Sequence, residues 1–138
     1  MSDRVDITRS IELDLEPRDV WELIGDGERW AEWMVDAADV DVVPGGGGQV
    51  RDVEGHRDVR IETVTEGERI AFEWWPVGRP DEASTVDLRI VPSSHGAVLE
   101  VVETFPATRA VTAVSAAAAR WRVRAGSLHA SRRLLLAA

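Results

Sequence analysis

The chain opens with a strictly alternating pattern of apolar and polar side chains. Between Val5 and Leu15, one side carries almost only aliphatic residues and the other carries Asp6, Thr8, Ser10, Glu12 and Asp14. A period of two is typical of a strand that is buried on one face. The sequence therefore predicts a strand over Val5–Leu15, with Arg9 as the one polar residue on the buried side.

Two short helical segments are expected next. Pro17 stands where a helix can begin, because proline lacks the N–H that would be unpaired in the first turn. Asp19–Ile24 makes about two turns whose apolar side is Val20, Trp21, Leu23 and Ile24. Gly25–Gly27 interrupts the pattern, and Glu28–Met34 then predicts a second helical turn carrying Trp30, Trp33 and Met34.

From Asp39 onward the pattern is that of strands separated by turns. Glu66–Glu68 and Pro92–Gly96 are rich in turn formers and join neighbouring runs as hairpins. Short strands at this spacing favour an antiparallel sheet over alternating strands and helices. The expected strands are Asp39–Val43, Gln49–Glu54, Arg57–Thr65, Arg69–Val77, Ser84–Val91 and Ala97–Phe105.

The last part of the chain predicts a long amphipathic helix. Thr108–Ala138 is rich in alanine and arginine and contains no proline, a composition that favours helix. Ser115 is a plausible N-cap. The apolar face, set by helical spacing from Trp121, would hold Val114, Ala117, Ala118, Ala125, Leu128 and Leu135.

Composition limits what the protein can be. A length of 138 residues with 44% hydrophobic and 30% charged residues is that of one globular domain, expected to span 1–138. The chain has no cysteine, lysine or tyrosine, which excludes disulfides, thiolate nucleophiles, Schiff-base chemistry and phenolic acids. No signal peptide or membrane-spanning run is visible, so we expect a cytoplasmic protein.

The charge is negative overall and unevenly distributed. A net charge of -9 argues against binding to nucleic acids or to anionic membranes. All 25 acidic residues lie at or before Glu103, whereas six arginines and no acidic residue follow it. The basic C-terminal segment either complements the acidic sheet within the domain or offers a docking surface to an acidic partner.

The order of these elements and several local motifs resemble the START-like (SRPBCC) superfamily. Within it the chain resembles the homologues of the heat-shock-protein ATPase activator. The resemblance implies an α+β helix-grip (Bet v 1-like) fold, in which a curved antiparallel sheet of about six to seven strands surrounds a long C-terminal helix. The residues that carry it are Pro17-x-x-Val20-Trp21, Arg29-x-x-x-Trp33, Gly46–Val50, Arg69-Ile70-x-Phe72-x-Trp74, Val86-x-Leu88-x-Ile90-x-Pro92, Gly96-x-x-Leu99-x-Val101-x-Glu103 and Trp121.

Such an architecture predicts a binding site between sheet and helix. A curved sheet cannot pack flush against a straight helix along its whole length, and a mostly apolar space with a few polar groups is typical of small-molecule pockets. Alternatively, the aromatic residues fill the core and leave only a vestigial cavity. The expected ligand-binding residues are Trp33, Met34, Phe72, Trp74, Leu88, Val101, Glu103, Phe105, Trp121 and Ala125.

Glu103 is the most informative single position. By alternation it shares an inward face with Leu99, Val101 and Phe105, and a buried carboxylate without a partner is costly. In a structural role it would pair with an arginine of the final helix, with Arg124 as the first choice. In a functional role it would bind a polar ligand group or act as a general base.

The remaining candidates are weaker. Gly45–Gly48 lacks the lysine and hydroxyl residue of a phosphate-binding loop and is interpreted as a hairpin turn. No spacing among His56, His95 and His129, or among Asp36, Asp39 and Asp41, matches a zinc or calcium site. Trp75 follows Trp74 and should lie on the outer face of the sheet, where it or the C-terminal helix could support a homodimer.

Three functions remain open at this point. The first is binding of a small hydrophobic molecule, with no cofactor and no metal. The second is a cyclase- or hydrolase-like enzyme that uses Glu103 as general base. The third is a co-chaperone-like protein-interaction module that uses the basic helix or Trp75.

Overall fold

The computed structural model describes residues 4–106, 115–122 and 124. Residues 115–122 are helical. The other elements, in chain order, are β1 (Arg4–Leu13), α1 (Pro17–Gly25), the 3-10 helix η1 (Gly27–Glu32), β2 (Ala37–Val40), β3 (Gly47–Asp52), β4 (Gly55–Thr65), β5 (Arg69–Pro76), the 3-10 helix η2 (Pro80–Glu82), β6 (Ser84–Ser93) and β7 (Gly96–Pro106).

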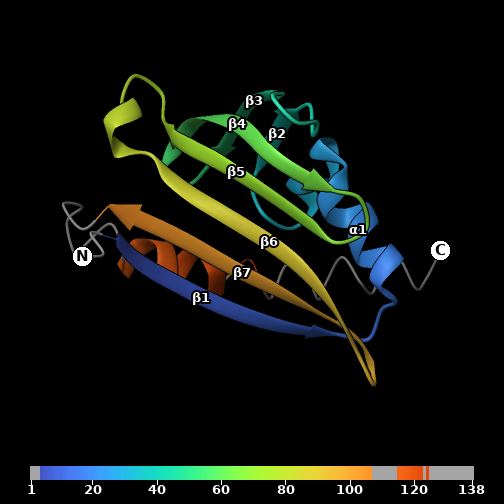
Figure 1. Cartoon of the computed structure of the whole chain (residues 1–138). Helices are drawn as coiled ribbons and strands as arrows, with labels where there is room; N and C mark the ends of the chain where they lie inside the picture. Colours follow the sequence, from blue (N-terminus) through green and yellow to red (C-terminus); the bar gives the residue numbers. More distant parts are fainter. Residues whose placement is uncertain (1–3, 107–114, 123, 125–138) are drawn as a thin grey trace.

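The strands form one antiparallel sheet in the order β1-β7-β6-β5-β4-β3-β2. Consecutive strands from β2 to β7 are neighbours, as expected for hairpin connections. The first strand instead pairs with the last, from Arg4 opposite Pro106 to Leu13 opposite Ala97. Figure 1 shows a strongly curved sheet, with β1 and β7 along one side and β2, β3 and β4 along the other.

The structure confirms the seven expected strands and the antiparallel pairing. The faces are as predicted in β7, where half-buried and buried residues alternate from Gly96 to Phe105. In β1 the prediction holds for Ile11 and Leu13 but is wrong for Val5, which is 40% exposed. The second helical segment is a 3-10 helix, and its first turn is capped by Asp26, whose carboxylate accepts a hydrogen bond from the Glu28 amide at 3.0 Å. A side-chain cap satisfies one of the amides that the start of a helix leaves unpaired.

The glycine run between β2 and β3 is only partly a turn. Gly45 has a φ of 80°, which glycine adopts at no steric cost, but Gly47 and Gly48 already belong to β3. A Cβ atom on Gly48 would lie 1.9 Å from the carbonyl oxygen of Asp39 in the neighbouring strand. The expected hairpin turn is therefore shorter than the four glycines, and Gly48 allows close approach of two backbones.

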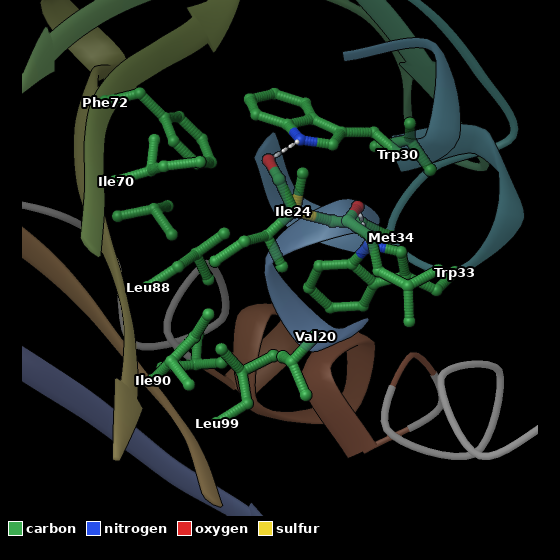
Figure 2. Close-up of a cluster of buried hydrophobic side chains, with 14 of the residues drawn as sticks. Val20, Ile24, Trp30, Trp33, Met34, Ile70, Phe72, Leu88, Ile90 and Leu99 are labelled. Carbon is green, nitrogen blue, oxygen red and sulfur yellow. Dashed lines mark hydrogen bonds between the residues drawn. The ribbon is translucent and has the colours of Figure 1, made fainter. Parts of the chain in front are cut away.

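The helical segments pack on the concave, apolar face of the sheet. Figure 2 shows Val20 and Ile24 of α1 facing Leu88, Ile90 and Leu99 of the sheet. Trp30 and Trp33 are anchored to the end of α1, because their indole N–H groups donate to the carbonyl oxygens of Ile24 (2.8 Å) and Leu23 (3.2 Å). These bonds allow two large aromatic side chains to be buried without an unpaired donor.

The long C-terminal helix is not confirmed, since the described helix covers residues 115–122 only. Within it, Ala117 and Trp121 are buried as the spacing predicted. Ser115 is itself helical, so the structure does not show it as an N-cap. Val114, Ala125, Leu128 and Leu135 lie outside the described residues. None of the helices in the described part of the chain is long and apolar enough to cross a membrane.

Candidate functional site

Three neighbouring strands place polar side chains together at one end of the concave face. Trp74 lies near the end of β5, Ser84 begins β6 directly opposite it, and Glu103 lies near the end of β7. All three are buried, Glu103 completely. The helical residues Arg120 and Trp121 close the group, which we term the buried polar cluster (Trp74, Ser84, Glu103, Arg120 and Trp121).

The four other members of the buried polar cluster all donate to the carboxylate of Glu103. Its Oε2 accepts from the Ser84 hydroxyl at 2.5 Å and from the Trp74 indole at 2.9 Å. Its Oε1 accepts from an Arg120 guanidinium N–H at 2.6 Å and from the Trp121 indole at 2.9 Å. Four donors around one carboxylate, one of them cationic, satisfy a charge that would otherwise be costly to bury.

The environment of Glu103 keeps the carboxylate ionised. Burial raises the pKa of Glu103, but the positive charge of Arg120 and the hydrogen bonds from Ser84, Trp74 and Trp121 outweigh it and hold the pKa below its ordinary value of 4.5. A general base that works near neutral pH needs a pKa close to that pH and an unengaged lone pair. The pKa of Glu103 is lowered instead, and both of its carboxylate oxygens already accept two hydrogen bonds. This arrangement is typical of a structural ion pair.

The partner of Glu103 is Arg120, and the expectation that Arg124 would fill this role is wrong. Arg120 immediately precedes Trp121, so both residues reach the same carboxylate. Arg124 lies about one helical turn further along and donates instead to Asp36 at 3.1 Å, in the loop before β2. Two arginines thus attach the helix to the rest of the molecule at different points.

An aromatic cluster fills the space in front of the buried polar cluster. Trp30 and Phe72 have ring centroids 4.9 Å apart, and Phe72 meets Trp74 edge-on at 5.3 Å. Trp121 stacks on Trp74 at 6.2 Å and contacts Trp33 at 6.3 Å. These separations are those of directly packed aromatic rings. We refer to Trp30, Trp33, Phe72, Trp74 and Trp121 as the aromatic cluster.

The predicted ligand-binding residues lie in this packed interior. Nine of the ten are in the described part of the chain, and all nine are buried: Trp33, Met34, Phe72, Trp74, Leu88, Val101, Glu103, Phe105 and Trp121. Ala125 lies outside the described residues. Because the rings contact one another, these residues form core as they stand, and their role in ligand binding stays a prediction.

A groove runs along the outside of the same region, between the helix and the β3–β4 turn. Its volume is about 430 Å³, and we term it the rim groove. Arg120 belongs to both regions, since it lines the rim groove while its guanidinium lies 5.2 Å from the ring centroid of Trp74. The rim groove is lined by Asp36, Asp52, Val53, Glu54, Ala116, Ala119, Arg120 and Arg124.

Two residues that line the rim groove each have one side-chain atom that is buried and makes no hydrogen bond. Neither Asp52 Oδ2 nor Arg120 Nε makes a hydrogen bond in the described structure, although their side chains are only 1% and 8% exposed. Both atoms nonetheless belong to ion pairs: Asp52 Oδ2 itself lies 3.6 Å from Arg57 Nε, and Arg120 pairs with Glu103 and Glu54. Buried polar atoms are nearly always hydrogen-bonded in proteins, so each such exception needs an explanation.

Other sequence candidates do not come together. His56 is exposed at the start of β4, His95 is exposed in the β6–β7 turn, and His129 lies outside the described residues. Within residues 4–106, 115–122 and 124, no three histidine or acidic side chains are grouped as metal ligands. Trp75 is half-buried opposite Asp58 of β4, and its role in a homodimer stays a prediction.

Sequence reasoning missed several polar residues of this region, although a signal for them existed. Asp52 follows buried Val50 by two positions, and Ser84 precedes buried Val86 by two. Arg57 stands in the same relation to Val59 and is also buried. Each shares the inward face of its strand by simple alternation. All three lie at the same end of the sheet as Glu103, because these strands are antiparallel.

The ion pair predicts a specific pH dependence of stability. A carboxylate whose native pKa is lowered contributes stability that is fully present above its unfolded pKa and is lost as pH falls through the native pKa. We therefore expect the stability gap between the wild type and Glu103→Gln to be full at neutral pH and to close on acidification. Urea denaturation of both proteins from pH 7 to pH 3 measures it, and a gap that widens in acid would contradict the assignment.

A family match and several solved structures agree with the fold described above. The family described as "Polyketide cyclase / dehydrase and lipid transport" matches residues 4–134. Protein MLL2253 from Mesorhizobium loti superimposes with a TM-score of 0.79 at 16% identity, over 95% of this chain and 96% of that protein. No curated protein sequence matches the chain.

Two further structures share the fold. DynU16, a protein in the dynemicin biosynthetic locus, has a TM-score of 0.73 at 22% identity, with 94% of this chain covering 46% of that one. CalU16 from Micromonospora echinospora has a TM-score of 0.69 at 19% identity, with coverage of 91% and 73%. At these identities the likeness shows a shared fold and nothing about shared chemistry.

Proposed function

Since the chain belongs to the polyketide cyclase/dehydrase and lipid transport family, within the START-like superfamily, we propose that it binds a small, mainly apolar molecule without transforming it. The narrower resemblance to homologues of the heat-shock-protein ATPase activator stays a prediction. The proposal places the ligand in the rim groove, with the aromatic cluster behind Arg120.

The observation that carries the proposal is the composition of the rim groove. Its apolar part consists of Ala116 and Ala119 on the helix and Val53 at the β3–β4 turn, which is 89% exposed. Its polar part is charged and largely engaged in ion pairs. A concave apolar surface with a few placed polar groups is what small-molecule sites share, and about 430 Å³ is within their usual size range.

An enzyme that uses Glu103 as general base is the second candidate, favoured by the family description and by the biosynthetic locus of DynU16. The geometry of Glu103 argues against it. Its carboxylate accepts four hydrogen bonds and is buried behind Arg120. A substrate would have to displace Arg120 or Trp121 before it could transfer a proton to Glu103.

A protein-interaction module receives less support from the surface. The large apolar residues exposed in the described part of the chain are Val5, Val43, Val53 and Val77. They come from four separate segments, namely β1, the loops after β2 and β5, and the β3–β4 turn. Interaction sites are typically contiguous apolar patches of several hundred square ångströms, and single valines do not make one.

The proposal is tested by filling the rim groove. Ala119 is exposed and lines it, so Ala119→Trp should occupy the apolar part without touching the core. We expect the affinity for a neutral N-phenylnaphthylamine probe to fall at least about tenfold, or about 1.4 kcal/mol. Fluorescence titration of the probe measures this, and tryptophan emission reports from the adjacent aromatic cluster.

The matched control is Arg122→Trp, which places the same side chain on an exposed position of the same helix outside the rim groove. It should leave probe affinity within about twofold. Unchanged binding in Ala119→Trp would remove the rim groove as the site. Loss of binding in Phe72→Leu at unchanged stability would then assign the ligand to the interior.

A further inference from the structure

We infer that two copies of this chain associate through β1, edge to edge, so that their sheets join into one antiparallel sheet. This inference is independent of the proposed function. β1 is the last strand on its side of the sheet, and Figure 1 shows it as the outermost strand there. In the described part of the chain the backbone of β1 bonds only to β7. Alternate N–H and C=O groups of β1 therefore point away from the sheet and can pair with another strand.

β1 lacks most of the features that protect the edge of a sheet. Such features are a short strand, a proline, a bulge or a covering helix. β1 has ten residues without proline, and its register against β7 is unbroken from Arg4 to Leu13. The opposite edge differs, because β2 has only four residues (Ala37–Val40) and η1 packs against it. Edge pairing is therefore expected at β1 and not at β2.

Charged side chains can also protect an edge, but those of β1 fit a second copy of the same strand. We consider antiparallel pairing about a two-fold axis that passes through Thr8. On the outer face, Arg4 then lies opposite Glu12 of the second copy, and symmetry repeats this contact. Asp6 lies opposite Ser10 of the second copy. Arg4 and Glu12 of one chain are roughly 26 Å apart along the strand, so they can pair with each other only between copies.

The charges of β1 also select this register. Directly opposite residues must face the same side of a sheet, so the neighbouring registers differ by a shift of two residues. A shift in one direction places Arg9 opposite Arg9 and Asp6 opposite Glu12, which are like-charge contacts. A shift in the other direction places Arg4 opposite Ser10 and loses both ion pairs.

The same register accounts for the exposed Val5. Val5 lies on the side of β1 that carries Ile11 and Leu13, yet it is 40% exposed. In the paired sheet it lies opposite Ile11 of the second copy, and directly opposite side chains on one face contact each other. Pairing would therefore cover part of the apolar surface that the single chain leaves open.

Charge reversal tests both the pairing and its register. Sedimentation equilibrium of the wild type should show a monomer–dimer equilibrium. Arg4→Glu and Glu12→Arg each put like charges at both symmetry-related contacts, and each should weaken dimerisation at least about tenfold. Glu12→Arg is the sharper test, because it brings the net charge of -9 closer to zero and would strengthen association if net charge alone mattered.

Mixing the two single variants should restore the dimer. One copy then carries two acidic ends and the other carries two basic ends, so both contacts between them are attractive. The double variant Arg4→Glu/Glu12→Arg should likewise dimerise as the wild type does. Restored association in the mixture also shows that both single variants fold. The matched control is Arg60→Glu, which makes the same charge change at an exposed position of β4, four strands from β1, and should leave the dimer affinity within about twofold.

Several outcomes would overturn the inference. A wild type that stays monomeric at the highest concentration would do so, because the edge would then be protected by its charges. A dimer that persists unweakened in either single variant would assign association to another surface. A mixture of the two single variants that stays monomeric, or an equal loss in Arg60→Glu, would remove the pairing of Arg4 with Glu12.

Discussion

Glu103→Ala lowers the free energy of unfolding by about 3–5 kcal/mol, the expected loss when one partner of a buried ion pair is removed. The reason is that Arg120 stays buried, with 8% of its side chain exposed, after its counterion has gone. The indole groups of Trp74 and Trp121 lose their acceptor at the same time. Urea denaturation at neutral pH gives the free energy directly.

The control for this effect is Glu100→Ala. Glu100 lies on the same strand but on the opposite face, where it is half-buried opposite Arg89 of β6. Its removal should change the free energy of unfolding by no more than about 0.5 kcal/mol. Adding Arg120→Met to Glu103→Ala should recover part of the loss. A loss below about 1 kcal/mol in Glu103→Ala would show that the pair does not hold the helix to the sheet.

The second large effect is expected at Trp121, which joins the helix to both the aromatic cluster and the buried polar cluster. Its side chain is completely buried, so Trp121→Ala should cost about 3–5 kcal/mol through lost packing. Amide hydrogen exchange should show that residues 115–122 lose more protection than β6, since the helix loses its main apolar anchor. Probe binding in the rim groove should fall with it, because Ala116 and Ala119 form one wall.

Two variants separate packing from hydrogen bonding at this position. Trp121→Phe keeps an aromatic ring but removes the donor to Glu103, and we expect a smaller loss of about 1.5–3 kcal/mol. Trp21→Ala serves as control, because Trp21 of α1 is only partly buried and should cost less than Trp121→Ala. Equal losses for the two alanine variants would contradict a special role of Trp121.

The sheet could be predicted from the sequence because its signal is local. Alternation in β1 and β7 identifies both the strands and their buried faces, and glycine-containing turns mark the hairpins. The pairing of β1 with β7 does not follow from local pattern and was not predicted; the structure supplies it. The length of the C-terminal helix stays a prediction beyond residues 115–122.

The site was predictable only in part, for a geometric reason. Alternation placed Glu103 correctly inside, and it would have placed Asp52, Arg57 and Ser84 there too had polar residues been considered as inward positions. The choice between Arg120 and Arg124 depends on how the helix is rotated and shifted against the sheet. No local pattern in the sequence reports that shift, so the sequence alone does not identify which arginine pairs with Glu103.

The family setting makes the buried state of Glu103 informative about function. A carboxylate at the end of β7 is available for chemistry only if the helix leaves it a free lone pair. Here the helix supplies Arg120 and Trp121 as donors to the Glu103 carboxylate. In this structure the Glu103 carboxylate is therefore fully engaged as the anionic partner of a buried ion pair.

The pairing of the first strand with the last also bears on how the chain is made. During synthesis Arg4–Leu13 leaves the ribosome long before its neighbour, Gly96–Pro106, has been translated. The hairpins from β2 to β6 can form as they emerge, whereas β1 must wait with its aliphatic side chains uncovered. Contacts between residues so distant in sequence slow folding, and we expect the nascent chain to be most prone to aggregation in this interval.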